Sequence, residues 1–415
     1  TITDYKSSGR KGAQAKDEEV LVMEKVSGQK RKSRLRGWVF WPPFLVLLMV
    51  LILGFVSQDA FLKVVNGVKD WIWGNFKWLF SGYGLAAVGV CFYACFSKFG
   101  NTVIGGKDAK PILGKFNWFA ISLCTTIAAG LMFWAAAEPL YLMSDPSPFF
   151  DIEPNSPQAA VFAMAQMYLH WGITPYAIYA LAATVFAFVY YNMKKPFTLG
   201  ACIYPLLGEK AIKGRLSDAI DALCIFILCA GMAGSLSTGA FSVAGGISNI
   251  TGIPNSSVML ILVMTAIILV YTISASSGLM KGIKWLSSFN VYIFSFLILF
   301  IFAFGPTKFI LNFGVESVGE MMDSFFMRNL FTDSMDLGNS AWSSLANMKV
   351  GYWASYLAWA PVTALFLGKL ARGYKIRDCI IINLFVPTVF SMVWVAIFGG
   401  TAIHMHMQES LLPLL

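Results

Sequence analysis

The sequence predicts an all-α integral membrane protein, and three observations support this fold class. Hydrophobic residues make up 57% of the 415 residues, compared with about 45–50% in soluble proteins. Charged residues make up 13%, about half of the usual share. The apolar residues also gather into runs of about 20 residues or more, the length that a helix needs to cross a bilayer. Because these runs lack the period-2 alternation of a barrel strand, we expect helical spans.

Nine apolar runs are long enough to be membrane-spanning helices. The first follows a polar tail, residues 1–37, and is not followed by a clean cleavage site, so we do not interpret it as a signal peptide. The nine predicted spans are residues 38–57, 78–97, 116–143, 159–193, 217–247, 257–276, 285–305, 350–368 and 379–401. An odd number of spans, a first residue that is Thr and a short segment after the ninth span suggest a truncated chain.

Lysine and arginine are distributed unevenly between the two sides of this predicted topology. If the tail is inside the cell, 25 of the 31 basic residues fall on inner segments and six on outer ones. Inner loops of membrane proteins carry the excess of basic residues, so we expect a cytoplasmic N-terminus in a multi-pass protein of the plasma or inner membrane. The net charge of +9 then reflects topology, and we expect no nucleic-acid partner. The polar composition of the tail predicts disorder.

The long outer segment, residues 306–347, has the pattern of an amphipathic helix at the membrane interface. Its apolar face could pack on the same chain, on lipid or on a neighbouring copy. The residues predicted on that face are Val318, Met321, Met322 and Phe325, whereas Glu316, Glu320 and Asp323 fall off it.

The spans contain few residues suited to catalysis or metal binding. Glu138 and His170 are ionisable, but both lie near predicted outer ends where water is expected to reach them, and this favours structural roles. The seven cysteines are interpreted as small buried hydrophobic residues, because none is paired with His at zinc spacing. No Ser/His/Asp set or phosphate loop stands out. We therefore predict neither an enzyme nor a metal site.

Small residues interrupt two of the spans. The third span contains Thr126-Ile-Ala-Ala-Gly130, and the fifth is rich in glycine. Such residues allow helices to pack closely, and they also allow a helix to unwind beside a cavity. The glycines of the fifth span are Gly231, Gly234, Gly239, Gly245 and Gly246.

Aromatic residues form two stripes at helical spacing. Stripes of this kind can face lipid or pack in a core, but aromatic ring faces also attract cations, each ring contributing about 0.5–2 kcal/mol. A cage of rings would suit a quaternary ammonium, which has no N–H donors, and would need no buried carboxylate partner. The fourth span offers Trp171, Tyr176 and Tyr179, and the eighth offers Tyr352, Trp353, Tyr356 and Trp359.

Five motifs resemble those of the betaine/choline/carnitine transporter family from about residue 78 onward. They are Gly130-Leu-Met-Phe-Trp-Ala-Ala-Ala-Glu-Pro139, His170-Trp-Gly-Ile-Thr-Pro-Tyr-Ala-Ile-Tyr179, Phe304-Gly-Pro-Thr307, Tyr352-Trp-Ala-Ser-Tyr-Leu-Ala-Trp-Ala-Pro361 and Phe398-Gly-Gly-Thr-Ala-Ile-His404. The resemblance implies a LeuT-like inverted-repeat fold with twelve spans, nine of them present here, a substrate site halfway across the membrane and usually a homotrimer.

The resemblance also implies a division of the chain. The parts are the basic tail (1–37), two peripheral spans with an inner loop (38–115), the first five-helix repeat (116–305), the outer segment (306–347) and the start of the second repeat (348–415).

The resemblance assigns the binding residues one by one. The substrate-binding positions are Trp134, Trp171, Tyr176, Tyr179, Trp353, Ser355, Tyr356 and Trp359, with the backbone of Ala128 and Gly130. This chain departs from the family pattern at several of them. Of the usual Gly-x-Gly-x-Gly only Gly130 remains, Tyr176 replaces a usual Trp, and Ser355 and Tyr356 stand where two tryptophans are usual. A smaller and more polar cage is implied. The positions that resemble one sodium site are Leu228, Met232 and Val362, which makes sodium doubtful there.

These observations together predict a secondary active transporter of a small quaternary-ammonium or related methylated compound, working by alternating access through the aromatic cage. Two alternatives remain open. One is a transporter of amino acids or amines on the same scaffold, and the other is a non-transporting membrane sensor. No cofactor is expected, and the partners are a small onium substrate and the lipid bilayer.

Overall fold

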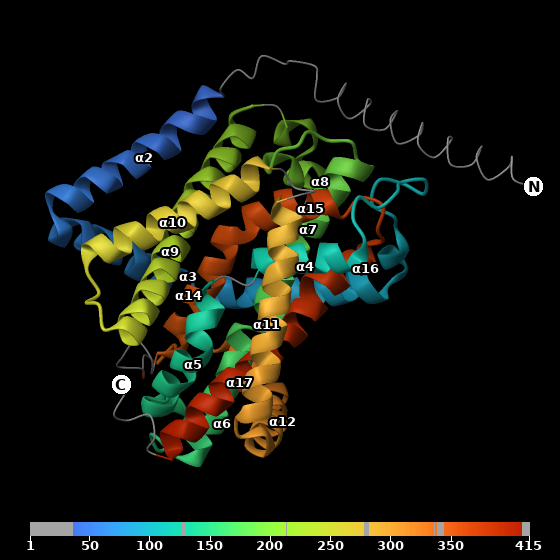
Figure 1. The fold of residues 1–415 in the computed structure, drawn as a ribbon. Coiled ribbons are helices and arrows are strands. Elements are labelled where there is room, and N and C mark those ends of the chain that lie inside the picture. Colours follow the sequence, from blue (N-terminus) through green and yellow to red (C-terminus); the bar gives the residue numbers. More distant parts are fainter. Residues whose placement is uncertain are drawn as a thin grey trace, which may run out of the picture.

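The structure, a computed structural model, describes residues 36–126, 129–212, 214–277, 282–335, 337 and 344–408. Within these ranges the chain is built of helices and contains no β-strand beyond a single bridge between Val103 and Lys375. In this described part of the chain, eight helices are long and apolar enough to cross a membrane, or nine if the bent pair α4 and α5 is one span. The all-α membrane fold is therefore confirmed, and each of the nine predicted spans coincides with one of these helices or pairs (Figure 1).

The helices follow the predicted runs with some breaks inside them. The spanning helices are α2 (Gly37–Val56), α3 (Gln58–Phe96), α4 (Lys115–Thr126) with α5 (Ala129–Ser144), α6 (Pro157–His170) with α7 (Ile173–Ala187), α9 (Arg215–Thr251), α10 (Ser257–Ser276), α11 (Lys284–Phe304), α14 (Leu345–Val362) and α16 (Ile376–Ile380) with α17 (Val386–Met407). Shorter helices are α8 (Tyr204–Leu207), α12 (Thr307–Asp323), α13 (Phe325–Leu330) and α15 (Gly368–Leu370). Wider π-helical turns occupy Phe188–Asn192, Thr363–Leu367 and Ile381–Phe385.

Helix α3 is much longer than the span predicted over residues 78–97. It begins at Gln58, directly after Ser57, whose hydroxyl accepts a hydrogen bond from the Ala60 N–H, and it contains 39 residues. At 1.5 Å per residue it is about 58 Å long, more than the roughly 40–45 Å thickness of a bilayer. The apolar-run criterion missed its polar first half, because that half is helical without being hydrophobic.

The third and fourth spans are both broken near their middles. Helices α4 and α5 meet at an angle of 56°, at the small-residue stretch where the sequence left close packing and unwinding both open. Helix α6 ends at His170 and α7 begins at Ile173. Gly172 lies between them, and a Cβ there would be 2.1 Å from the Tyr168 carbonyl oxygen, so only glycine fits. These breaks place Trp171 at a helix junction.

Helix α9 does not unwind, although its glycines suggested that it could. It continues from Arg215 to Thr251 and packs against α2, α10 and α14. Most of its residues, and those of α2 and α10, are not buried in the protein, which leaves an apolar surface for lipid. In Figure 1 these three helices lie together at one side of the molecule.

The predicted outer amphipathic helix is present as α12, but its buried face differs from the predicted one. Ile310, Phe313, Ser317 and Met321 are buried, whereas the side chain of Met322 is 69% exposed. The helix begins at Thr307 and its contact stripe follows Ile310 and Phe313, so the chain covers only part of the predicted apolar face and leaves Met322 uncovered. This stripe packs on α6 and α17, so the helix is bound to its own chain.

Loops that were predicted on the same side of the membrane are in contact. On the predicted inner side, the Ile104 N–H donates to the Tyr374 carbonyl at 2.9 Å, and Arg36 pairs with Asp218 and Asp221 at the start of α9. On the predicted outer side, the rings of Phe149 and Phe331 are 4.8 Å apart. These contacts agree with the predicted grouping of loops, and the assignment of the N-terminal side to the cytoplasm stays a prediction.

Candidate functional site

A cavity of about 1030 Å³ lies among α3, α5, α7, α9 and α14. Its walls contain most of the residues that the sequence assigned to substrate binding. These are Gly130, Trp134, Trp171, Tyr179, Ser355, Tyr356 and Trp359. The cavity is therefore the candidate substrate site, and it brings together residues from both aromatic stripes.

Tyr356 is at the centre of the aromatic contacts. Its ring centroid is 4.9 Å from that of Tyr179 and 6.3 Å from that of Trp171. Edge and tilted arrangements of this kind are favourable between aromatic rings and leave some ring faces open. One wall of the cavity thus combines rings from the α6–α7 junction, α7 and α14.

Two predicted binding residues do not line the cavity. Tyr176 is fully buried behind Tyr179 and Tyr356, and its hydroxyl lies 2.6 Å from that of Ser391. Trp353 is also fully buried, and its Nε1 would lie 3.0 Å from a Cβ added at Gly84 of α3. Tyr176 supports the cage from behind, whereas Trp353 packs on α3. Ala128 lies outside the described residues.

The structure adds cavity residues that the sequence did not assign. From α14, Tyr352 belonged to a stripe but was not among the predicted binding residues. From α3 come Lys69, Asp70 and Trp73, which lie in the half of the helix that hydropathy missed. Helix α9 contributes Gly231, which approaches α14 so closely that an added Cβ would be 3.3 Å from the Ala358 Cβ. The glycine content of the fifth span was the only signal for this last contact.

A buried carboxylate lies next to the aromatic wall, although the cage was expected to need none. Glu138 and His170 are both 0% exposed, so the expectation that water reaches them was wrong. Glu138 Oε1 is 2.6 Å from His170 Nδ1, and its Oε2 accepts hydrogen bonds from Trp171 Nε1 at 3.1 Å and from the Tyr352 hydroxyl at 2.5 Å. Three partners thus compensate the cost of burying this group.

A chain of hydrogen bonds continues from His170 to α13 and α12. Gln166 Nε2 is 2.9 Å from His170 Nε2, and Gln166 Oε1 accepts from Arg328 Nη1 at 3.0 Å. Arg328 is 2% exposed and pairs with Glu320 of α12 at 2.9 Å. Burial lowers the pKa of the Arg328 guanidinium, although Glu320 opposes this shift. The Arg328 side chain remains charged at neutral pH, because the ordinary pKa of arginine is far above neutral.

Lys349 fixes the start of α14 to the end of α13. It is 1% exposed, and its Nζ donates to the carbonyls of Asn329 at 2.7 Å and Phe331 at 2.6 Å. A cation at the C-terminal end of a helix satisfies carbonyls that have no partner within the helix. Lys349 thus acts as a structural clamp at the N-terminal end of α14.

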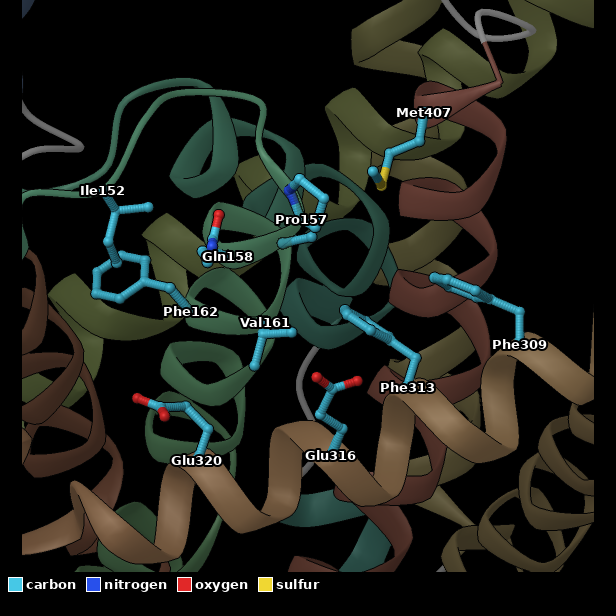
Figure 2. A pocket seen from close by; sticks show the side chains of 11 residues that line it. Ile152, Pro157, Gln158, Val161, Phe162, Phe309, Phe313, Glu316, Glu320 and Met407 are labelled. Carbon is cyan, nitrogen blue, oxygen red and sulfur yellow. The ribbon is translucent and has the colours of Figure 1, made fainter.

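A second cavity, of about 570 Å³, lies outside the cage, between α6, α12 and the end of α17. Figure 2 shows Phe313, Glu316 and Glu320 projecting from α12 toward α6, with Met407 on α17 nearby. Glu320 is shared between this outer pocket and the pair with Arg328. The outer pocket contains none of the predicted binding residues.

The positions that resemble a sodium site do not fit sodium. Leu228 and Met232 of α9 and Val362 of α14 carry no oxygen in their side chains, whereas a hard cation requires oxygen ligands. No step proposed below depends on sodium.

This fold and this cavity define a class, the multi-pass helical membrane proteins with a ligand-sized chamber between their spans. A family model for betaine/carnitine/choline family transporters (BCCT) matches residues 38–412, and the chain belongs to that family. Members of this family are transporters and not enzymes.

Several curated relatives align along most of the chain. The glycine betaine transporter OpuD of Bacillus subtilis is 30% identical over 372 residues, which cover 89% of this chain and 71% of OpuD. The betaine/ectoine transporter LcoP of Corynebacterium glutamicum is 30% identical, with 92% of this chain and 60% of LcoP covered. The osmo-dependent choline transporter BetT2 of Acinetobacter baylyi is 31% identical, with 90% of this chain and 53% of BetT2 covered.

Proposed function

We propose that this chain moves a small quaternary-ammonium or related methylated compound across the plasma membrane by secondary active transport. The observation that carries the proposal is the aromatic wall of the central cavity, where Trp171, Tyr179 and Tyr356 come together. Ring faces hold a trimethylammonium group without N–H donors. The names of the relatives, which are transporters of betaine, choline or ectoine, support the same class of substrate.

The proposed cage consists of the rings that border the cavity. Trp134 lies on α5 and Trp359 on α14, so they add rings beyond the central group. Ser355 and the tyrosine hydroxyls offer polar contacts to the remainder of a substrate.

The proposed mechanism is alternating access. Each broken span consists of two helical segments, one on either side of the break. Helices α4 and α5 meet at 56°, and Gly172 lies between the end of α6 at His170 and the start of α7 at Ile173. Helices that are interrupted beside a substrate site are typical of transporters built from inverted repeats. We further propose a division into repeats at residues 116–305 and 348–415, a cytoplasmic N-terminus and assembly as a homotrimer.

The experiment that tests the function is counterflow in proteoliposomes containing the full chain. Vesicles loaded with unlabelled glycine betaine or choline should accumulate the labelled compound, and Trp359→Leu should lower this accumulation at least about tenfold because a cage ring is lost. The matched control is Trp285→Leu, since the Trp285 side chain, at the start of α11, is 67% exposed and does not line the cavity. This control should transport normally.

The same assay separates the alternatives. Inhibition by primary amines or amino acids, but not by trimethylated compounds, would contradict the proposed substrate class. Binding without any exchange would indicate a sensor in place of a transporter.

A further inference from the structure

The carboxylate of Glu138 receives hydrogen bonds from two aromatic residues of the cavity wall. Its Oε2 accepts from Trp171 Nε1 at 3.1 Å and from the Tyr352 hydroxyl at 2.5 Å, and both of these residues line the cavity. Glu138 itself is fully buried and does not line the cavity. Any effect of Glu138 on a ligand must therefore pass through these rings or through its charge.

The hydrogen-bond chain behind Glu138 determines which groups donate. Arg328 can only donate, so the Gln166 oxygen must face it and the Gln166 NH₂ must face His170. His170 Nε2 then accepts, which leaves the proton on Nδ1 and directs it to Glu138 Oε1. The imidazole is neutral in this arrangement, and Glu138 accepts from all three neighbours. An acceptor of three hydrogen bonds is the ionised carboxylate.

We infer that Glu138 is a positioning and polarising residue for the cation site, an inference that rests on the proposed function. A hydrogen bond to an anion draws positive charge toward the N–H or O–H at the ring edge and leaves more negative charge on the ring face. The Trp171 and Tyr352 faces thus attract a cation more strongly than unpaired rings would. The negative charge of Glu138 also favours a cation across the low-dielectric interior. A neutral ligand of the same shape gains from neither effect.

The test compares ligands that have the same shape and a different charge. Glycine betaine and choline each have an isostere in which a tert-butyl group replaces the trimethylammonium, namely 3,3-dimethylbutanoate and 3,3-dimethylbutan-1-ol. Binding of each pair to the purified full chain gives an affinity ratio of cation to isostere. A residue that only supports the fold would affect both members of a pair equally.

Glu138→Gln keeps the shape of the side chain and removes its charge. We expect it to weaken binding of the trimethylammonium compound about tenfold, while affinity for the neutral isostere of choline, 3,3-dimethylbutan-1-ol, changes less than about twofold. Glu138→Asp should retain part of the wild-type preference for the cation over its isostere, because the negative charge remains but the hydrogen bonds from Trp171 and Tyr352 lengthen.

Tyr352→Phe provides a variant that keeps the carboxylate and the ring. It removes one donor to Glu138, and we expect a smaller fall in the same ratio, by about threefold. If Glu138→Gln does not insert into the membrane, this variant decides the test alone. Tyr191→Phe is the matched control, because its hydroxyl donates to the Lys369 carbonyl at 3.0 Å, away from the cavity. The control should leave the ratio unchanged.

The outcomes separate this inference from the proposed function. A wild-type chain that does not prefer trimethylammonium to tert-butyl would contradict the cage itself. A wild-type preference that persists in Glu138→Gln and Tyr352→Phe would overturn only the role of Glu138. An equal loss of both ligands in these variants would also overturn it, since that result indicates a structural role.

Discussion

At the scale of single residues, position on the helix decides which aromatic side chains meet the cavity. Tyr352, Tyr356 and Trp359 of α14 follow one another at intervals of four and three residues and line the cavity together. Trp353 comes one residue after Tyr352 and is therefore rotated by about 100°, toward α3. The sequence placed all four residues in one stripe, because the spacing of aromatic residues does not show whether Tyr352 or its neighbour Trp353 lines the cavity.

Trp353 offers a direct test of this distinction. We expect Trp353→Phe to leave substrate affinity within about twofold of wild type, because the side chain lies outside the cavity, and to lower stability by about 1–3 kcal/mol through loss of buried volume. Equilibrium binding and thermal unfolding in detergent measure the two effects. The comparison variant is Trp359→Phe, which removes part of a cavity-lining ring. Equal losses of affinity in the two variants would show that Trp353 also contacts the ligand.

At the scale of helices, close approaches at glycine hold the helices around the cavity in place. Gly399 brings α17 against α5 so tightly that an added Cβ would be 2.8 Å from the Ala135 carbonyl oxygen and 3.1 Å from the end of Met164. The Ala135 carbonyl oxygen belongs to the backbone and cannot move aside on its own, so α17 and α5 would have to separate. Helix α5 carries Trp134 and Glu138, and a shift of α5 would therefore reach the cage.

Gly399→Ala should consequently destabilise the protein by about 1–3 kcal/mol, as other overpacked interiors do. The measurement is the midpoint of thermal unfolding in detergent. Gly89→Ala is the matched control, because nothing lies within 4 Å of a Cβ added there on α3. The control should keep or slightly raise the midpoint, since alanine favours helix over glycine. An unchanged midpoint for Gly399→Ala would refute the tight contact of α17 with α5.

The sequence was informative about helices to the extent that they are apolar. It located the spans that the structure describes, because lipid requires long hydrophobic runs, and its small residues marked the stretch after Thr126 as a place where a helix could pack closely or break. It missed the polar half of α3, and it left open whether the glycines of α9 unwind the helix. A helical segment that is not hydrophobic, such as the first half of α3, gives no comparably strong signal in the sequence. Glycine is compatible with both a continuous helix and an unwound one, so it did not decide the conformation of α9.

At the scale of the whole molecule, the cage depends on contacts between distant parts of the chain. Glu138 of α5, His170 of α6 and Tyr352 of α14 meet in one buried cluster, which Arg328 connects to the outer helices. The motifs around these residues indicated a family and hence a site, but not the hydrogen bonds between them. Those bonds depend on helix packing over separations of up to 214 residues, which local patterns do not encode.

The central claim is that a methylated cation binds among the rings of the α6–α7 junction, α7 and α14. The most direct measurement is an experimental structure of the full chain with glycine betaine bound. We predict density for the trimethylammonium group within about 6 Å of the ring centroids of Tyr356 and at least one of Trp171, Tyr179 and Trp359. Density in the outer pocket beside Glu316 and Glu320, with the central cavity empty of ligand, would contradict the account.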